Sequence, residues 1–355
     1  MDKIVSYQCP NCEAPLSYAP EKQGFFCEYC LGLFSEEVLR AMQTELGATT
    51  QEEPPQNLDG EEDVFLQMDE YSCPNCGAEV ACDGNTVATF CCYCHTPVIH
   101  RGKVSGHLKP HRIVPFQYDK EGAREVFLRF IRKKKFVPRG FFAPEQLEKM
   151  QGIYYPFWLT DADTFSHMSA KATQVRRWIA GNYRYTETSY YAISRGGEIH
   201  FEDIATSALS EGDKEMLEGI LPFPSEALQP FSMPYLSGFL TKKRDIEKEA
   251  LEAEVQRRME EYATQLLRGT IGSYTSVKVE QTNVNAHRVG WEYALFPVWL
   301  MVWKGKRRNY MYAMNGHTGK IYGELPISWK KVMALAAGVF SAVAGIAALI
   351  GGLLL

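Results

Sequence analysis

Cationic side chains are scarce in the first 100 residues. Only Lys3, Lys22 and Arg40 stand there against seventeen Asp and Glu, a net charge of −14, whereas residues 101–355 carry +9. A module that binds nucleic acid needs clustered Lys and Arg to contact the phosphates. The scarcity therefore argues against nucleic-acid binding by the N-terminal region, and we expect no nucleic acid among the partners.

Catalytic signatures are also missing. The sequence contains no GxxxxGK[ST] phosphate loop, HExxH or GxSxG, and its eight histidines are scattered. Neighbouring carboxylates such as Glu202-Asp203 and Asp161/Asp163 stand in polar contexts that are typical of solvated turns. The sequence therefore predicts a protein that is not an enzyme, with no catalytic residue.

Cysteine, in contrast, follows a repeated pattern. Two CxxC pairs separated by fourteen residues occur twice, and both first pairs read Cys-Pro-Asn-Cys. Two thiolates on one tight turn reach the same metal, and a second pair completes the closed tetrahedral site of structural zinc. The pattern predicts two zinc ribbons, each with one structural Zn²⁺. The predicted ligands are Cys9, Cys12, Cys27, Cys30, Cys73, Cys76, Cys91 and Cys94.

A disulfide framework is the alternative interpretation of these cysteines. It fits small secreted chains, and no signal peptide is evident here, so reduced thiols in the cytosol are expected. Cys82 and Cys92 remain outside the pattern, and Cys82 is given no role. Only Cys91 reproduces the CxxC spacing, which leaves open whether Cys92 or His95 also contributes to the second site.

Charge is absent again at the other end of the chain. The run Val332–Leu355 has no charged residue and exceeds the ~20 residues that cross a bilayer as a helix. Trp329-Lys330-Lys331 precede it, and cations there predict that the bulk of the chain lies in the cytoplasm. The sequence therefore predicts a single-pass anchor in the cell membrane, over 329–355. A series of small residues in the span (Ala334, Gly338, Ala342) suggests packing with another helix, and hence an oligomer.

The remaining chain predicts an α+β fold with an antiparallel sheet, because hairpin signals dominate and βαβ alternation is missing. Helices are expected over 120–135 and 245–268, and a hairpin is expected to turn at Gly196-Gly197. Each half of the body places an aromatic Pro-Phe-Trp or Pro-Val-Trp strand after a helix, which suggests an internal duplication. The expected units are ribbon one (1–35), a helix and acidic flexible linker (36–69), ribbon two (70–100), the body (101–328, halves 109–235 and 236–328) and the anchor (329–355).

Several segments resemble one bacterial family. They are Lys109-Pro-His-Arg-Ile-Val-Pro-Phe, Gly152-Ile-Tyr-Tyr-Pro-Phe-Trp-Leu, Tyr235-Leu-Ser-Gly-Phe, Phe296-Pro-Val-Trp-Leu and Ala313-Met-Asn-Gly-His-Thr-Gly-Lys. In this order they are similar to TFIIB-type zinc-ribbon membrane proteins, which are often labelled as relatives of the PriA helicase. Some members are encoded beside SPFH (flotillin-like) proteins and phage-shock protein A homologues. The resemblance implies a role in membrane organisation or envelope stress, with such proteins as partners.

Together these features predict a non-enzymatic, membrane-anchored cytoplasmic adaptor whose zinc ribbons dock other proteins. Four basic groups in the body, at 132–135, 242–244, 304–308 and 330–331, favour an additional contact with anionic lipid. The alternative is a membrane-tethered zinc-ribbon factor that binds nucleic acid or regulates transcription.

Overall fold

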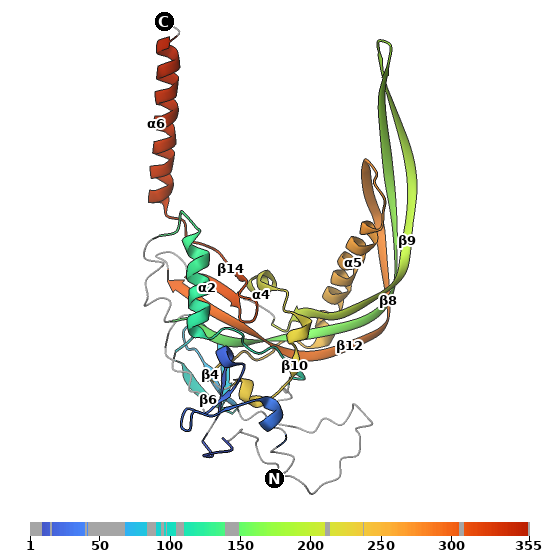
Figure 1. The fold of residues 1–355 in the computed structure, drawn as a ribbon. Helices are drawn as coiled ribbons and strands as arrows, with labels where there is room; N and C mark the ends of the chain where they lie inside the picture. Colours follow the sequence, from blue (N-terminus) through green and yellow to red (C-terminus); the bar gives the residue numbers. More distant parts are fainter. Residues whose placement is uncertain are drawn as a thin grey trace.

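The computed structural model describes residues 9–14, 16–39, 41, 68–83, 90–93, 96, 98–103, 110–138, 149–209, 214–236, 238–304 and 309–353. The fold is α+β, built around one large sheet (Figure 1). The predicted acidic linker and the ligand Cys94 lie outside the described residues.

The N-terminal third contains short strands. These are β1 (Ser17–Ala19), β2 (Gly24–Phe26), β3 (Leu33–Phe34), β4 (Met68–Ser72), β5 (Glu79–Asp83), β6 (Ile99–Lys103) and β7 (Arg112–Ile113), with the 3₁₀ turn η1 (Pro20–Lys22) after β1. Strands β1–β3 form a separate antiparallel sheet, whereas β4–β6 are joined to the large sheet through β5. The first predicted ribbon is therefore a small sheet of its own, and the second extends the sheet of the body.

The body and the C-terminal helix contain the longer elements. These are α2 (Lys120–Arg132), β8 (Gln151–Ala180), β9 (Tyr183–Ser207), α4 (Lys214–Ile220), η3 (Ser225–Ala227), β10 (Gln229–Pro230), η4 (Met233–Leu236), β11 (Leu240–Thr241), η5 (Lys248–Leu251), α5 (Glu252–Gly269), β12 (Ser276–Lys304), β13 (Asn309–Asn315), β14 (Ile321–Gly323) and α6 (Trp329–Leu353). The predicted helix over 120–135 is confirmed as α2, and Asp119 caps it by accepting the backbone N–H of Gly122.

Three long strands dominate the sheet. β8 is antiparallel to β12 from Gln151↔Leu300 to Thr173↔Ser276, and antiparallel to β9 from Phe157↔Ser207 to Ala180↔Tyr183. The long pairs agree with the predicted antiparallel sheet, while the short strands β7 and β11 pair in parallel with β12 and β8. In Figure 1 the three strands leave the body and curve upward as one ribbon.

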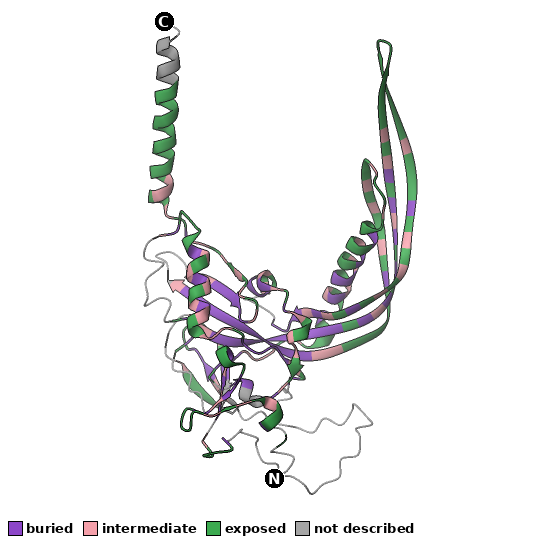
Figure 2. Cartoon of the chain, viewed as in Figure 1, coloured by how far each residue is buried: buried purple, intermediate pink, exposed green. Residues whose placement is uncertain are grey.

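Burial along β8 shows where the core ends. Residues 152–160 are all buried because both faces of the sheet are covered there. Tyr154 and Trp158 pack in the cluster that includes α2, and Tyr155 and Phe157 pack in the cluster that includes α4. From 161 to 173 buried and exposed residues alternate, as expected for a sheet covered on one face, here by α5 and the segment after it. Figure 2 shows the same change from purple to green along the strands.

The predicted hairpin turn at Gly196-Gly197 is wrong. Both glycines lie inside β9, and the chain turns instead between β8 and β9, where Gly181 has a φ of +60°. Gly196 is paired with His167, and a Cβ built on it would stand 3.0 Å from the carbonyl oxygen of Ser166. Glycine at position 196 therefore allows the two strands to approach closely, and it does not form a turn.

The second predicted helix begins later than expected. α5 starts at Glu252, not near Asp245, because the backbone N–H groups of Asp245 and Ile246 donate to the carbonyl of Ala208 and hold that segment against the sheet. Val255 and Met259 are buried against the sheet, whereas Tyr262 is 44% exposed. The suggested duplication stays a prediction, although its two aromatic strands, in β8 and β12, are antiparallel partners.

Helix α6 stands apart from the core. Its stretch Trp329–Ile346 is long and apolar enough to cross a membrane, and none of it is buried. A core helix of a soluble protein would be mostly buried, so the exposure matches what a membrane-spanning helix needs. The first turn is held by backbone N–H donation from Ser328 to Phe136 and by the Lys331 ammonium, which donates to the carbonyl of Val137.

Candidate metal centres

The four cysteines of the first predicted ribbon meet at one point. The Sγ atoms of Cys9 and Cys30 lie 3.3 Å apart, and those of Cys12 and Cys27 lie 3.5 Å apart. All four sulfurs stand within 4.8 Å of one another. A tetrahedral site with metal–sulfur bonds of ~2.3 Å requires sulfurs ~3.8 Å apart. The first cluster can therefore hold a metal ion with four thiolate ligands.

The second cluster has the same form in its described part. The ligand atoms of Cys73, Cys76 and Cys91 also lie within 4.8 Å of one another, with 3.5 Å between the sulfurs of Cys76 and Cys91. Its predicted fourth ligand, Cys94, and the neighbouring His95 fall outside the described residues. Cys92 is buried and packs with Tyr155 and Val114 in the core cluster beside α4. This cluster too can hold a metal ion.

One local hydrogen bond explains how each CxxC turn presents its sulfurs. The backbone N–H of the first cysteine in each turn donates to the carbonyl five residues later, which closes the loop. The four bonds are Cys9 to Ala14 (2.7 Å), Cys27 to Gly32 (2.9 Å), Cys73 to Ala78 (2.9 Å) and Cys91 to Thr96 (2.8 Å). Because the fourth turn makes the same bond, the backbone around Cys91 follows the pattern of the other three. The repeat seen in the sequence is thus also a repeat of backbone geometry.

Hydrogen bonds favour the thiolate form of Cys27 in the first cluster. The backbone N–H of Cys30 lowers the pKa of the Cys27 thiol to about 7, whereas the hydrogen bond with Cys9 raises the pKa of the Cys30 thiol. A thiolate is the form that binds metal. The backbone N–H of Asn11 points at the sulfur of Cys9, at 3.4 Å. Cys9 and Cys27 are buried, whereas Cys12 is exposed. One side of the site is therefore covered by protein and the other faces solvent.

Ribbon one is docked on the body by aromatic side chains. The rings of Tyr18 and Phe25 lie 5.0 and 5.3 Å from the ring of Tyr235, and all three residues are buried. The Tyr235 hydroxyl is within hydrogen-bonding distance of Glu36 and Gln229. Gln23 donates from Nε2 to the carbonyl of Phe116, at 3.2 Å. Buried Cys9 and Cys27 belong to the same apolar cluster as these aromatic residues, so the first cysteine cluster and the body share one core.

Ribbon two is attached differently. Thr241 of β11 pairs with Ala81 of β5, which makes the strands of the second ribbon part of the large sheet. Tyr71 and Val80 pack in the cluster beside α4, and the Tyr93 hydroxyl lies 3.0 Å from that of Tyr155. The boundary predicted at residue 100 therefore separates segments that share a sheet. Sequence reasoning missed both attachments, and the buried aromatic residues of the ribbons were the signal available.

Ribbon one exposes three large apolar side chains that are close together in the sequence. Tyr29 is 78% exposed and Leu31 is 70% exposed, on the turn that carries Cys27 and Cys30. Leu33, on β3, is also exposed, and Leu31 adopts a φ of +59°, which aliphatic residues rarely do. We call Tyr29, Leu31 and Leu33 the knuckle surface. Tyr29 and Leu31 flank Cys30 in the sequence, so this surface lies beside the first cysteine cluster.

The carboxylates that were weighed as acid–base groups are held in ion pairs and hydrogen bonds. Asp203 accepts from Arg112 at 2.8 Å, and the carboxylate of Asp161 accepts the backbone N–H of Asp203. Asp163 raises the pKa of His200 through their hydrogen bond, and His200 lowers the pKa of Asp163 in return. These contacts pair the carboxylates with neighbouring groups on the surface of the sheet.

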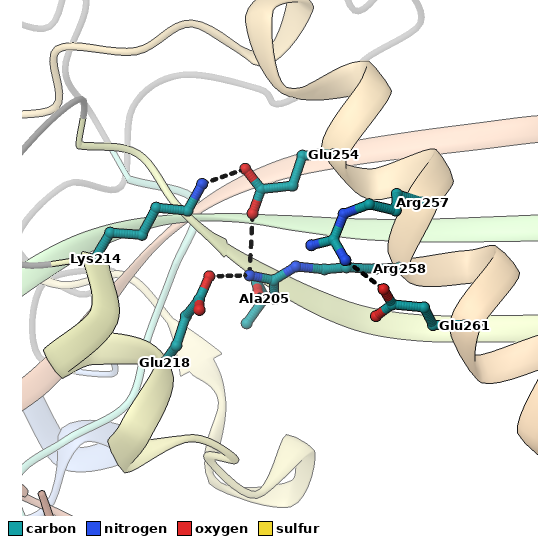
Figure 3. Close-up of polar contacts among 7 residues, drawn as sticks. All are labelled: Ala205, Lys214, Glu218, Glu254, Arg257, Arg258 and Glu261. Carbon is teal, nitrogen blue, oxygen red and sulfur yellow. Dashed lines mark hydrogen bonds and ion pairs between the residues drawn. The ribbon is translucent and has the colours of Figure 1, made fainter.

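A further polar cluster, for which no signal was found in the sequence, joins three elements (Figure 3). Arg258 of α5 donates to Glu218 of α4 at 2.8 Å, to Glu254 at 3.1 Å and to the carbonyl of Ala205 in β9 at 2.9 Å. Lys214 also pairs with Glu254. Although burial opposes it, the hydrogen bond from Lys214 holds the pKa of Glu254 below its usual range. The Arg258 guanidinium therefore fastens α4 and α5 to the sheet.

Comparison with known proteins gives one relative over nearly the whole chain. The sequence is 29% identical over 353 residues to a Bacillus subtilis (strain 168) protein described as "Uncharacterized protein YdjG". The match covers 98% of this chain and 99% of that protein. No family model matches the sequence, and no solved structure matches it either.

Proposed function

We propose that this protein is a non-enzymatic, membrane-anchored adaptor of the cytoplasm, whose two structural zinc sites shape a docking surface for another protein. One observation carries the proposal: the cysteine clusters and the apolar helix lie at opposite ends of the body. In Figure 1 the N-terminal strands and β4–β6 lie at the bottom, whereas α6 leaves from the top. A bilayer crossed by α6 would therefore leave the ribbons facing away from it.

Charge around the base of α6 supports this orientation. Arg132, Lys133, Lys134 and Lys135 are exposed at the end of α2, and the segment that follows them is bonded to the first turn of α6. With Lys330 and Lys331 they gather cations where the helix would enter the membrane. Cations there favour the cytoplasmic leaflet, which carries anionic lipid. The predicted group at 242–244 does not join them, because Arg244 packs over the rings of Trp158 and Tyr293.

The knuckle surface supports a protein partner over nucleic acid. Large exposed apolar side chains close together are typical of protein-binding surfaces. The first 100 residues carry a charge of −14, and each zinc with four thiolates would add about −2. A phosphate backbone would be repelled, while a partner with basic residues around an apolar contact would be attracted.

We also propose membership in the TFIIB-type zinc-ribbon membrane proteins, on the motifs quoted above. The partners would then be membrane-organising proteins of the SPFH or phage-shock type. The alternative, a tethered nucleic-acid factor, would be favoured by recovery of nucleic acid instead of protein in the test that follows.

The test is affinity purification of the full chain from detergent-solubilised membranes, compared with the variant Tyr29→Ser/Leu31→Asn. Asn suits the left-handed backbone at position 31, and both side chains are exposed, so the ribbon should keep its metal. We expect a protein that co-purifies with the native chain at constant ratio and is lost with the variant. The same proteins recovered from both chains would contradict a docking role for the knuckle surface. Tyr262→Ser, on the exposed side of α5, is the control.

A further inference from the structure

The hairpin of β8 and β9 continues far beyond the rest of the sheet. β12 begins at Ser276, which is paired with Thr173, and the helix α5 covers only the lower part of the strands. From Gln174↔Ser189 to Ala180↔Tyr183 the two strands pair with each other and, within the described residues, with no third strand. We call residues 174–189 the finger. Every residue from 176 to 188 is exposed.

A ribbon of two strands is at best marginally stable in water without a partner layer. One face of the finger nevertheless carries aromatic side chains in an ordered arrangement. Trp178 and Tyr185 are cross-strand partners whose rings stack at 5.5 Å, and Tyr183, 72% exposed, lies on the same face. The Arg176 guanidinium stands 5.8 Å above the Trp178 ring. These aromatic side chains are ordered by contacts with one another although they are exposed, so they offer a surface to a binding partner.

The finger carries a net positive charge. Arg176, Arg177 and Arg184 surround the turn, and the one carboxylate of residues 174–189, Glu187, is the cross-strand partner of Arg176. Trp and Tyr combined with Arg form the side-chain set that settles at the headgroup level of a bilayer. An anionic surface therefore complements the finger in both charge and chemistry.

The direction of the finger agrees with this composition. Figure 1 shows the hairpin rising from the body on the same side as α6, opposite the ribbons. We propose that the aromatic face of the finger, flanked by Arg176 on the same face and by Arg177 and Arg184 on the opposite face, binds the headgroup layer of an anionic membrane as a second contact beside α6. The proposal rests on the membrane anchoring by α6 proposed above.

The depth of the contact is limited by the backbone. Both edges of the finger carry unpaired N–H and C=O groups, and such groups cannot enter hydrocarbon without a large cost. The finger therefore lies on the surface of the bilayer and not within its hydrocarbon core. Trp178 would then sit near the glycerol region, within reach of lipids brominated close to the headgroup.

The experiment uses the full chain in nanodiscs of neutral lipid or of lipid with 30% phosphatidylglycerol. The emission of Trp178 is obtained as the difference between the native chain and Trp178→Phe, which is needed because five other tryptophans are present. We expect quenching of Trp178 by headgroup-proximal bromolipid in anionic discs, and little in neutral discs. Replacing Arg176, Arg177 and Arg184 with Gln should weaken the contact on the order of 100-fold, about five-fold for each arginine.

The matched control replaces three exposed cations of η5 and α5, Lys248, Arg257 and Arg268, with Gln, and should leave the quenching unchanged. Unquenched Trp178 in anionic discs that carry the protein would overturn the proposal, as would equal quenching in neutral discs. If Trp178 is protected from the bromolipid quencher and the chain forms a dimer, the finger would contact a second copy of the chain instead of the membrane. Failure of the chain to elute with the discs would contradict the α6 anchor itself and, with it, the finger contact.

Discussion

The first cysteine cluster should stabilise the whole body and not only its own ribbon. Replacing Cys12 with Ser removes one metal ligand, and because Cys12 is exposed, little packing is lost with it. Structural zinc supplies most of the folding energy of such a small module, so ribbon one should unfold. Its unfolding would uncover Tyr235, which is 3% exposed in the native chain.

The size of the effect follows from the contacts between ribbon and body. Exposure of one buried aromatic side chain costs ~1.5–3 kcal/mol. The two ring pairs that Tyr235 makes with Tyr18 and Phe25 add ~0.5–1.5 kcal/mol each, and the bond from Gln23 to Phe116 adds about 1 kcal/mol. A loss of about 4 kcal/mol in the body should lower its Tm by ~8–16 °C at this size.

The assay is thermal unfolding of the full chain in detergent, followed by tryptophan fluorescence. All six tryptophans lie at or beyond Trp158, so the signal reports the body and the anchor but not the ribbons. The control Tyr29→Ser changes an exposed residue of the same turn and should leave both the metal content and the Tm unchanged. A Cys12→Ser chain that has lost one metal but melts at the native temperature would refute the coupling.

Further expectations concern the metal, the anchor, the charge and pH. Elemental analysis should find two zinc ions per chain, and fewer than two with intact thiols would count against the closed sites. Removal of Val332–Leu355 should release the chain into the soluble fraction, checked by fractionation; salt-resistant retention would show that the anchor assignment is incomplete. The zinc-loaded chain without this span should not bind DNA in a titration across a salt series, whereas micromolar, steeply salt-dependent binding would promote the nucleic-acid alternative. Because the folded pKa of Glu254 is lowered, its contribution to stability is present above pH ~4.3 and is lost as pH falls through the folded pKa. Lys214→Gln should reduce that acid-dependent loss in a melting series, and an unchanged pH profile would argue against the ion pair.

The sequence predicted the features that depend only on residues close together in the chain. A CxxC turn places two sulfurs on one loop, so the spacing alone indicates the clusters. The apolar run at the C-terminus likewise indicates a helix that could span a membrane, and the apolar residues at helical spacing after Lys120 indicate α2. The attachments of both ribbons depend on contacts far apart in the chain, such as Phe25 with Tyr235, and no local pattern encodes their partners.

The long strands illustrate a second limit. Two adjacent glycines are a strong turn signal, yet Gly196 and Gly197 continue β9 because pairing with β8 over more than twenty residues outweighs the local preference. The sequence did not reveal the finger for the same reason. The turn at Gly181 and Asn182 lies between two stretches whose sequences resemble ordinary surface strands. Its exposed aromatic residues become informative only when the strands beside it are known to end.

The most direct test of the adaptor function is site-specific crosslinking in intact cells. A photoreactive amino acid in place of Tyr29 stands on the knuckle surface beside the first cysteine cluster, and one in place of Tyr262 on α5 serves as the comparison. The account predicts a discrete protein adduct from position 29 in the membrane fraction, lost on adding Leu31→Asn, and none from position 262. Nucleic-acid adducts at position 29, or no adduct there from a fully membrane-bound chain, would contradict it.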